Sequence, residues 1–171
     1  MTKKKTKKIK KKLSVLKYQY HAIAAAVVII FVTSLTVIYY ESQPKPLDPR
    51  TVRLETYFAK YDMPLVAHAQ TFIDAADHYN LDWRLLPAIG VQESSGGKYM
   101  QLNNPFGWGS AEIPYNSIDD AIWDVTRHLA GHGSTTAKWY NVTSTERKLY
   151  FYNGSVRAAY IPEVMWIMEQ F

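Results

Sequence analysis

The stretch LPAIGVQESSGG, residues 86–97, decides the fold of this chain: it is an apolar run that ends on one carboxylate, Glu93. Its pattern predicts a largely buried helix that stops at the glycine pair at residues 96 and 97. A carboxylate in the last turn of such a helix meets the negative end of the helix dipole and an apolar wall, and both raise its pKa. A carboxylic acid that is still protonated near neutral pH can protonate a leaving oxygen, as cleavage of a glycosidic bond requires. Glu93 is therefore the candidate general acid.

A turn-rich aromatic loop, NNPFGWG at residues 103–109, follows about ten residues later. Sugar C–H groups pack on exposed aromatic faces while sugar hydroxyls need polar neighbours, so amides beside aromatic side chains are typical of a sugar cleft. Phe106 and Trp108 are candidates for such contacts. Packing in the core is the alternative for both, and equally for Tyr160 near the C-terminus.

The residues around this centre predict a mainly α-helical domain. Apolar side chains recur at helical spacing after Pro64, while Asp82 and Ser117 stand where the N-caps of two further helices are expected. Residues 98–116 carry glycine, proline, asparagine and aromatic residues without helical periodicity, which indicates a loop or a small hairpin. Helices are expected over residues 64–79, 83–94, 118–130, 144–152 and 162–171.

The charge of the chain is unevenly distributed. Among its 171 residues, 47% are hydrophobic and none is cysteine, which leaves room for one domain with a core after the N-terminal segment. The formal net charge of +5 comes from nine lysines at positions 3–17, and from Glu41 onward eleven basic and fifteen acidic residues give −4. A mildly acidic folded part argues against nucleic-acid binding. The absence of cysteine excludes disulfides and thiolate metal sites.

Residues 21–40 are predicted to form a single transmembrane helix. No charge lies between Lys17 and Glu41, and at about 1.5 Å per residue the apolar run spans roughly 28 Å, close to the hydrocarbon thickness of a bilayer. Tyrosines at both ends, at positions 18, 20, 39 and 40, suit the membrane interfaces. The basic residues 1–20 predict a cytoplasmic tail and an extracytoplasmic C-terminal part. A cleaved signal peptide is the alternative, but its apolar region would be shorter and followed by small residues.

Residues 41–62 are interpreted as a stalk. Prolines at positions 44, 46 and 49 make its first part semi-rigid, and a short helix over residues 51–61 would lead into the domain. The folded domain is then expected over residues 63–171.

Several motifs follow one another in an order that resembles a known superfamily. They are the helix with its Glu-Ser pair at residues 93 and 94, the paired glycines, the Asn-Pro-Phe-Gly-Trp-Gly loop and Tyr-Asn-Gly at residues 152–154. This superfamily is the lysozyme-like superfamily of peptidoglycan glycosidases, and the closest resemblance is to its endo-β-N-acetylglucosaminidase-like group. The resemblance covers roughly residues 65–171. It implies a lysozyme-like α-rich domain with a small loop or hairpin lobe, with Glu93 as the catalytic acid. It also implies a substrate cleft to which the following residues contribute: Ser94, Asn104, Phe106, Trp108, Tyr152 and Tyr160.

Some relatives place a second carboxylate in the loop that follows the aromatic segment, and Glu112 is the acidic residue at that place in this chain. Glu112 is therefore the candidate second catalytic residue. If it lies away from the cleft, a mechanism with one acid is needed, in which the acetamido group of the substrate assists. The Gly-Leu-Met-Gln pattern of lytic transglycosylases is missing after Glu93, which favours the glucosaminidase-like group.

No cofactor and no metal site are expected. His128 and His132 are four residues apart and so could share a zinc ion at a helix end, but no third ligand suggests itself. The expected partners are peptidoglycan glycan strands and the lipid bilayer, and the sequence points to no particular protein partner.

The sequence thus predicts a membrane-anchored peptidoglycan glycoside hydrolase in the cell membrane that cleaves β-1,4 links, with its domain outside the cytoplasm. Three alternatives stay open. The first is a lytic transglycosylase on the same fold, and the second is a non-catalytic peptidoglycan-binding or scaffold module. The third is a single-pass partner of the division or secretion machinery that acts through its transmembrane helix.

Overall fold

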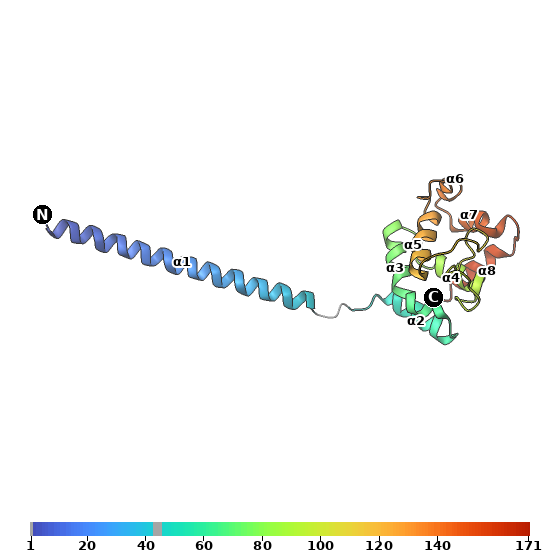
Figure 1. Ribbon diagram of the computed structural model, residues 1–171, viewed down its shortest axis with the longest axis horizontal. Coiled ribbons are helices and arrows are strands. Elements are labelled where there is room, and N and C mark those ends of the chain that lie inside the picture. Colours follow the sequence, from blue (N-terminus) through green and yellow to red (C-terminus); the bar gives the residue numbers. More distant parts are fainter. Residues whose placement is uncertain (1, 43–45) are drawn as a thin grey trace. The chain divides into compact units, whose positions relative to one another are not determined.

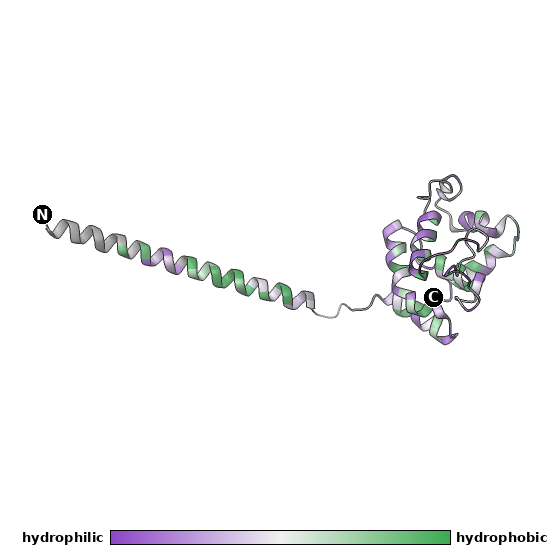
Figure 2. Ribbon diagram, viewed as in Figure 1, coloured by the Kyte–Doolittle hydropathy of each residue, from purple (hydrophilic) through white to green (hydrophobic). Residues whose placement is uncertain are grey.

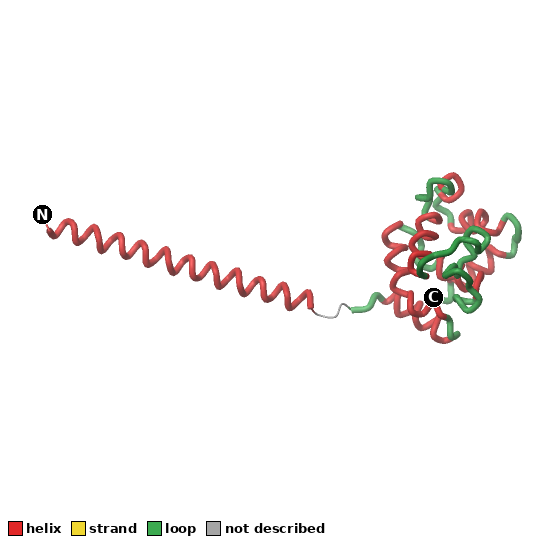
Figure 3. Tube along the Cα trace, in the orientation of Figure 1, coloured by secondary structure: helices red, strands yellow, loops and turns green. Residues whose placement is uncertain are grey.

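The computed structural model describes residues 2–42 and 46–171 (Figure 1). The chain separates into two compact units, residues 1–46 and Leu47–Phe171. The first unit is the helix α1 (Thr2–Ser42), and the second holds all the remaining helices. The residues predicted as a proline stalk include positions 43–45, which lie outside the described residues. Within the parts that are described the chain is mainly helical, as predicted, and contains no strand (Figure 3).

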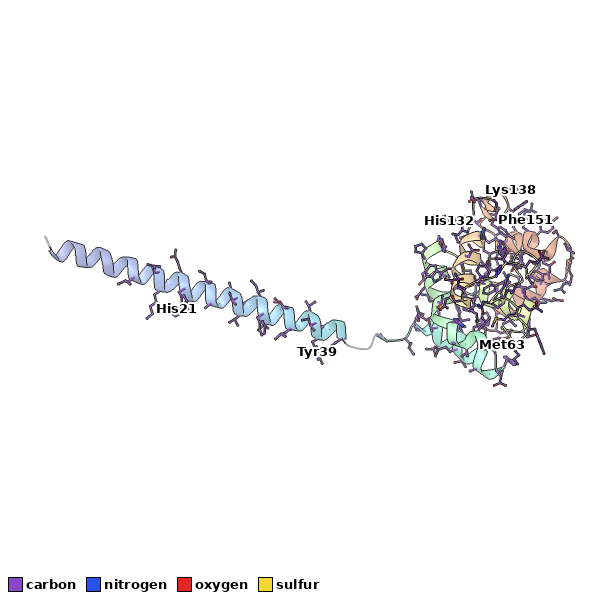
Figure 4. The ribbon with its side chains drawn as sticks, in the orientation of Figure 1. His21, Tyr39, Met63, His132, Lys138 and Phe151 are labelled. Atoms are coloured by element: carbon purple, nitrogen blue, oxygen red, sulfur yellow. The ribbon has the colours of Figure 1, made fainter. Side chains whose placement is uncertain are left out.

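Within α1, Leu16–Tyr40 is long and apolar enough to cross a membrane by length and composition. Figure 2 shows the hydrophobic stretch along this helix, and Figure 4 shows His21 and Tyr39 projecting outward from it. Phe31 is 64% exposed and Tyr39 62%. The hydroxyls of Thr33 and Ser34 donate to the carbonyl of Ile30 within the same helix, which is how polar side chains are satisfied in an apolar surrounding. The predicted span of residues 21–40 lies inside this segment.

The predicted boundary between stalk and domain, at residue 63, is wrong. The helix α2 (Pro49–Lys60) belongs to the domain, because Leu54 and Phe58 are fully buried in its core. Asp48 caps this helix by accepting a hydrogen bond from the Arg50 backbone N–H. The guanidinium of Arg50 also reaches Asp77, and so ties the start of α2 to the following helix.

The central helices of the domain follow the predicted pattern with small shifts. The predicted helix after Pro64 begins as the 3-10 helix η1 (Pro64–His68) and continues as α3 (Ala69–Tyr79), which ends on Asn80 in a left-handed conformation. The helix that carries the acid is α4 (Leu85–Ser94). It starts two residues later than predicted, and Asp82 accepts a hydrogen bond from the Arg84 backbone N–H just before it.

The second half of the domain contains α5 (Ile118–Leu129), α6 (Ala137–Tyr140), α7 (Thr145–Leu149), the π-helix η2 (Tyr150–Gly154) and α8 (Tyr160–Met168). Ser117 caps α5 as predicted, because its side chain accepts a hydrogen bond from the Asp120 backbone N–H. Residues 98–116 form a loop. Of the two predicted forms, a loop or a small hairpin, the structure shows the loop, and one isolated bridge between Gln101 and Asn104 is the extent of the pairing in this described segment.

Two helix pairs hold the core together: α3 packs on α5, and α4 packs on α8 (Figure 1). The interior between them contains aliphatic and aromatic side chains, of which Phe72, Ile89, Ile122 and Tyr160 are almost completely buried. Lys148 is also buried, and its ammonium donates to the carbonyls of Leu129 and Tyr140 at the ends of α5 and α6. A cation at two helix C-termini stabilises the orphan carbonyls there. The pair α4 and α8 positions the candidate site.

Candidate active site

Glu93 lies in the last turn of α4, and the end of this helix is tightly built. Ser95 adopts a left-handed conformation directly after it. The Ser94 hydroxyl donates to the Gly90 carbonyl at 3.0 Å and accepts from the Gly97 backbone N–H at 2.9 Å. Ser94 is buried and fully engaged in closing the helix, so the structure does not support its predicted role in substrate binding. Its function is to fix the turn from which Glu93 projects.

The aromatic loop packs directly on α4. Phe106 is completely buried and stands edge-on to Phe72, with ring centroids 6.1 Å apart. It also approaches Gly90, where an added Cβ atom would lie 3.2 Å from the Phe106 ring. The prediction that Phe106 contacts substrate is therefore wrong, because its ring is part of the core. This packing brings the next residue, Gly107, against the acid: a Cβ atom on Gly107 would lie 3.3 Å from Glu93 Oε2.

Asn104 organises the loop from inside. It is 2% exposed, its Nδ2 donates to the carbonyls of Trp108 at 2.8 Å and Ile113 at 3.3 Å, and its Oδ1 accepts from the Trp108 backbone N–H. An amide whose two donor hydrogens are used in this way has none left for a sugar. Asn104 was predicted to bind substrate, whereas its position is that of a residue that holds the loop in shape.

A row of aromatic rings leads from the loop to the acid. Trp108 is half-buried and packs on Tyr152, with ring centroids 5.6 Å apart, and on His128. Tyr152 stacks on Tyr160 at 6.0 Å with an angle of 6° between the rings, and its hydroxyl donates to the Phe106 carbonyl. Tyr160 is the first residue of α8. Of the predicted residues, the structure places Tyr152 and Tyr160 near Glu93 and connects Trp108 to them through Tyr152. Tyr160 is completely buried, so, like Phe106, its ring is part of the core and the structure does not support its predicted contact with substrate.

The electrostatics of Glu93 agree with the role of an acid. One side of its side chain is open to solvent, yet the surrounding protein buries the carboxyl enough to raise its pKa. Polar interaction with the Tyr160 hydroxyl and the positive charge of Arg157 oppose this rise without reversing it. The presence of Glu93 in turn contributes to raised pKa values of Tyr152 and Tyr160, although burial is the main cause.

Tyr160 has an unusual hydroxyl. Among the described residues it is the one buried side-chain polar atom that lacks a hydrogen bond of normal geometry. Buried polar groups in native structures almost always have a partner, and those that do not often occur at functional sites. The Tyr160 hydroxyl lies close enough to Glu93 to favour the charged carboxylate, so this buried group belongs to the surroundings of Glu93.

A chain of polar side chains next to Tyr160 was not foreseen from the sequence. Arg157 pairs with Glu163 at 2.7 Å and lies 5.5 Å from the Tyr160 ring centroid. Glu163 also accepts a hydrogen bond from the amide of Gln92 at 3.0 Å, which links α8 back to the last turn of α4. Two features of the sequence could have indicated these contacts. Arg157 and Glu163 each lie three residues from Tyr160, and Gln92 directly precedes Glu93.

Glu112 does not join this group. It is exposed in the loop, and its backbone N–H donates to the Gly109 carbonyl. No hydrogen bond or charge interaction connects it with Glu93 in the described structure. The two histidines considered for zinc also have separate surroundings, with His128 against Trp108 and His132 against Tyr79. Over the residues described, no three His, Cys, Asp or Glu side chains are arranged to hold a metal ion.

A larger hollow of the domain lies elsewhere than the candidate site. It has a volume of about 760 Å³ and is lined by residues of α3, of α7 and of the segments that follow α3, α5 and α6, including Asn80, His132 and Lys148. Glu93 is not among them. The candidate site is defined by its chemistry, because the raised pKa of the carboxyl and the buried Tyr160 hydroxyl meet at Glu93. Such an arrangement can donate a proton to a bound oxygen.

Protein-family models, characterised proteins and solved structures give no match to this chain.

Proposed function

We propose that this chain is a membrane-anchored glycosidase that cleaves β-1,4 links in the glycan strands of peptidoglycan, with Glu93 as the general acid. The observation that carries the proposal is the position of Glu93, at the end of an apolar helix, against Gly107 and beside Tyr160. This environment raises the pKa of the carboxyl and leaves one side open to solvent, as a proton donor to a sugar oxygen requires. The lysozyme-like resemblance of the sequence adds support for this substrate class.

In this mechanism Glu93 transfers its proton to the oxygen of the scissile bond as the bond between that oxygen and the sugar C1 breaks. The C1 centre then carries positive charge and must be attacked from its other face. Because Glu112, the predicted second carboxylate, has no charge interaction with Glu93, we take the acetamido oxygen of the substrate as the nucleophile. Water then opens the resulting ring, and Glu93 takes up a proton from that water and is regenerated.

The same observation favours a second candidate, a lytic transglycosylase. Such an enzyme also needs only one acid, because a hydroxyl of the sugar itself attacks C1 and yields an anhydro product. Trp108 and Tyr152 would shape the sugar-binding surface in both cases, with the buried Tyr160 stacked on Tyr152, and neither reaction needs a cofactor.

The anchoring is part of the proposal. The apolar segment of α1 would cross the cell membrane once, with the basic residues 1–20 in the cytoplasm and the domain outside, as the positive-inside rule favours. The enzyme would then act on wall material close to the membrane.

The test uses the full chain in detergent, incubated with purified peptidoglycan, with released fragments read by mass spectrometry. Wild type should release fragments, Glu93→Gln should release none, and the matched variant Glu112→Gln should behave as wild type. Reducing ends would identify a hydrolase and anhydro ends a transglycosylase. If wild type and both variants bind peptidoglycan equally and release nothing, the domain is a wall-binding module and the proposal is wrong.

A further inference from the structure

A hollow of about 440 Å³ lies between the end of α4 and the outer face of α8, next to the candidate acid. Its lining consists of Gln92, Pro162, Glu163, Trp166 and Ile167. Trp166 is 61% exposed, the most exposed tryptophan of the domain that is described, and its indole N–H takes part in no described hydrogen bond. Its exposed ring offers an apolar face, with a free polar edge, to a ligand.

The composition of this hollow suits a sugar ring. Pro162, Trp166 and Ile167 offer an apolar floor, on which the C–H face of a sugar or the methyl of an acetamido group can pack. The carboxylate of Glu163 and the amide of Gln92 supply hydrogen-bonding groups at the edge. A mainly apolar surface with a few polar groups is typical of a small-molecule site.

Polar contacts link the hollow to the surroundings of the candidate acid. Gln92 directly precedes Glu93, and its amide is fixed to Glu163 at 3.0 Å. Glu163 is held by Arg157, which lies over the ring of Tyr160. Trp166 stands six residues after Tyr160 on α8, about 9 Å further along the helix axis. The two helices that position the acid therefore also form this hollow.

We infer that the hollow of Gln92, Glu163 and Trp166 is a second subsite for an N-acetylated sugar of the same glycan strand, with Trp166 as its binding platform. The inference rests on the proposed function for the identity of the strand. Trp166 does not take part in bond cleavage, and it contributes by holding a sugar at a distance from the scissile bond. Long oligosaccharides gain this contact, whereas a disaccharide bound at Glu93 does not reach it.

The binding test separates this subsite from catalysis. In the full chain in detergent, carrying Glu93→Gln to prevent turnover, the affinity for a β-1,4-linked N-acetylglucosamine hexamer is measured by calorimetry. Adding Trp166→Ala should weaken hexamer binding by about tenfold and leave disaccharide binding unchanged. Trp166→Tyr, which keeps a ring, should restore most of the affinity. The matched control is Trp139→Ala, which removes another exposed tryptophan, 42% exposed on α6, and should change neither affinity.

A second measurement guards against misfolding of the alanine variant. Hexamer binding should change the intrinsic fluorescence of the chain, and this change should be reduced in Trp166→Phe but not in Trp139→Phe. Wild-type affinity and an unchanged fluorescence response in the Trp166 variants would overturn the inference, even if wild type cleaves peptidoglycan. Conversely, loss of hexamer affinity in Trp166→Ala would support the subsite even if no cleavage occurs. A hexamer that does not bind the Glu93→Gln chain at all would also overturn it.

Discussion

Gly107 lies against the carboxyl of Glu93, so closely that a Cβ atom on Gly107 would come within 3.3 Å of Oε2. Gly107 has a positive φ of 63°, in the region where side chains are strained. The loop and the acid thus depend on each other, because the absence of a side chain at residue 107 leaves the carboxyl room beside the backbone. Phe106 anchors the loop in the core on one side of this contact, and the Asn104 amide holds it on the other.

Gly107→Ala should therefore damage both stability and activity. A side chain at this φ should cost about 1 kcal/mol of stability, and the added methyl should displace the carboxyl and reduce cleavage by about tenfold or more. Chemical unfolding and release of peptidoglycan fragments measure the two effects. Gly109→Ala is the matched control, because Gly109 has a φ of 61° but faces Ile113 rather than Glu93. Equal activity losses in both variants would contradict a specific contact with the acid.

The stability of the chain should depend on the protonation of Glu93. Its raised pKa means that folding favours the protonated form, so this contribution is present below the ordinary pKa of 4.5 and is lost as the pH rises through the raised value. Glu93→Gln, which stays neutral, should therefore be more stable than wild type at pH 7 and nearly equal to it at pH 4. Thermal unfolding across this range measures the difference. A difference that is independent of pH would show that burial does not disfavour the charged carboxylate.

Arg157 should set the upper pH limit of activity. Its positive charge lowers the pKa of Glu93, so Arg157→Gln should raise that pKa further and keep the acid protonated to higher pH. The alkaline limb of the pH profile for peptidoglycan cleavage should then move to higher pH. Arg147→Gln is the control, since Arg147 lies over the rings of Tyr150 and Phe151 on a different helix. The idea fails if both variants keep the wild-type profile.

Two neighbouring tyrosines should respond differently to loss of their hydroxyls. Tyr152 donates to the Phe106 carbonyl, so Tyr152→Phe should cost about 1 kcal/mol of stability. The Tyr160 hydroxyl is buried without a hydrogen bond of normal geometry, so Tyr160→Phe should leave stability unchanged or increase it. It should also raise the pKa of Glu93, since the hydroxyl favours the carboxylate. Unfolding curves for the two variants, measured side by side, test this contrast. A larger loss of stability for Tyr160→Phe would contradict the structure.

Local sequence patterns predicted the features that depend on neighbours along the chain. The apolar run in α1 is visible as composition, and the Ser117 cap depends on a residue three positions away. The placement of Glu93 at the end of a buried helix followed from the apolar residues before it and the glycines after it. In each case the physical cause, whether periodicity, capping or turn preference, acts over a few residues.

The tertiary structure decided everything that depends on contacts between distant segments. It drew α2 into the domain through Leu54 and Phe58, and it turned Ser94, Asn104 and Phe106 from predicted ligands into parts of the framework. It also assembled Arg157, Glu163 and Gln92 beside the acid. The sequence by itself determined that Glu93 lies at the end of a buried helix. Its neighbours were decided by packing of α4 on α8, because a hydrogen bond across 71 positions leaves no periodic trace in the chain.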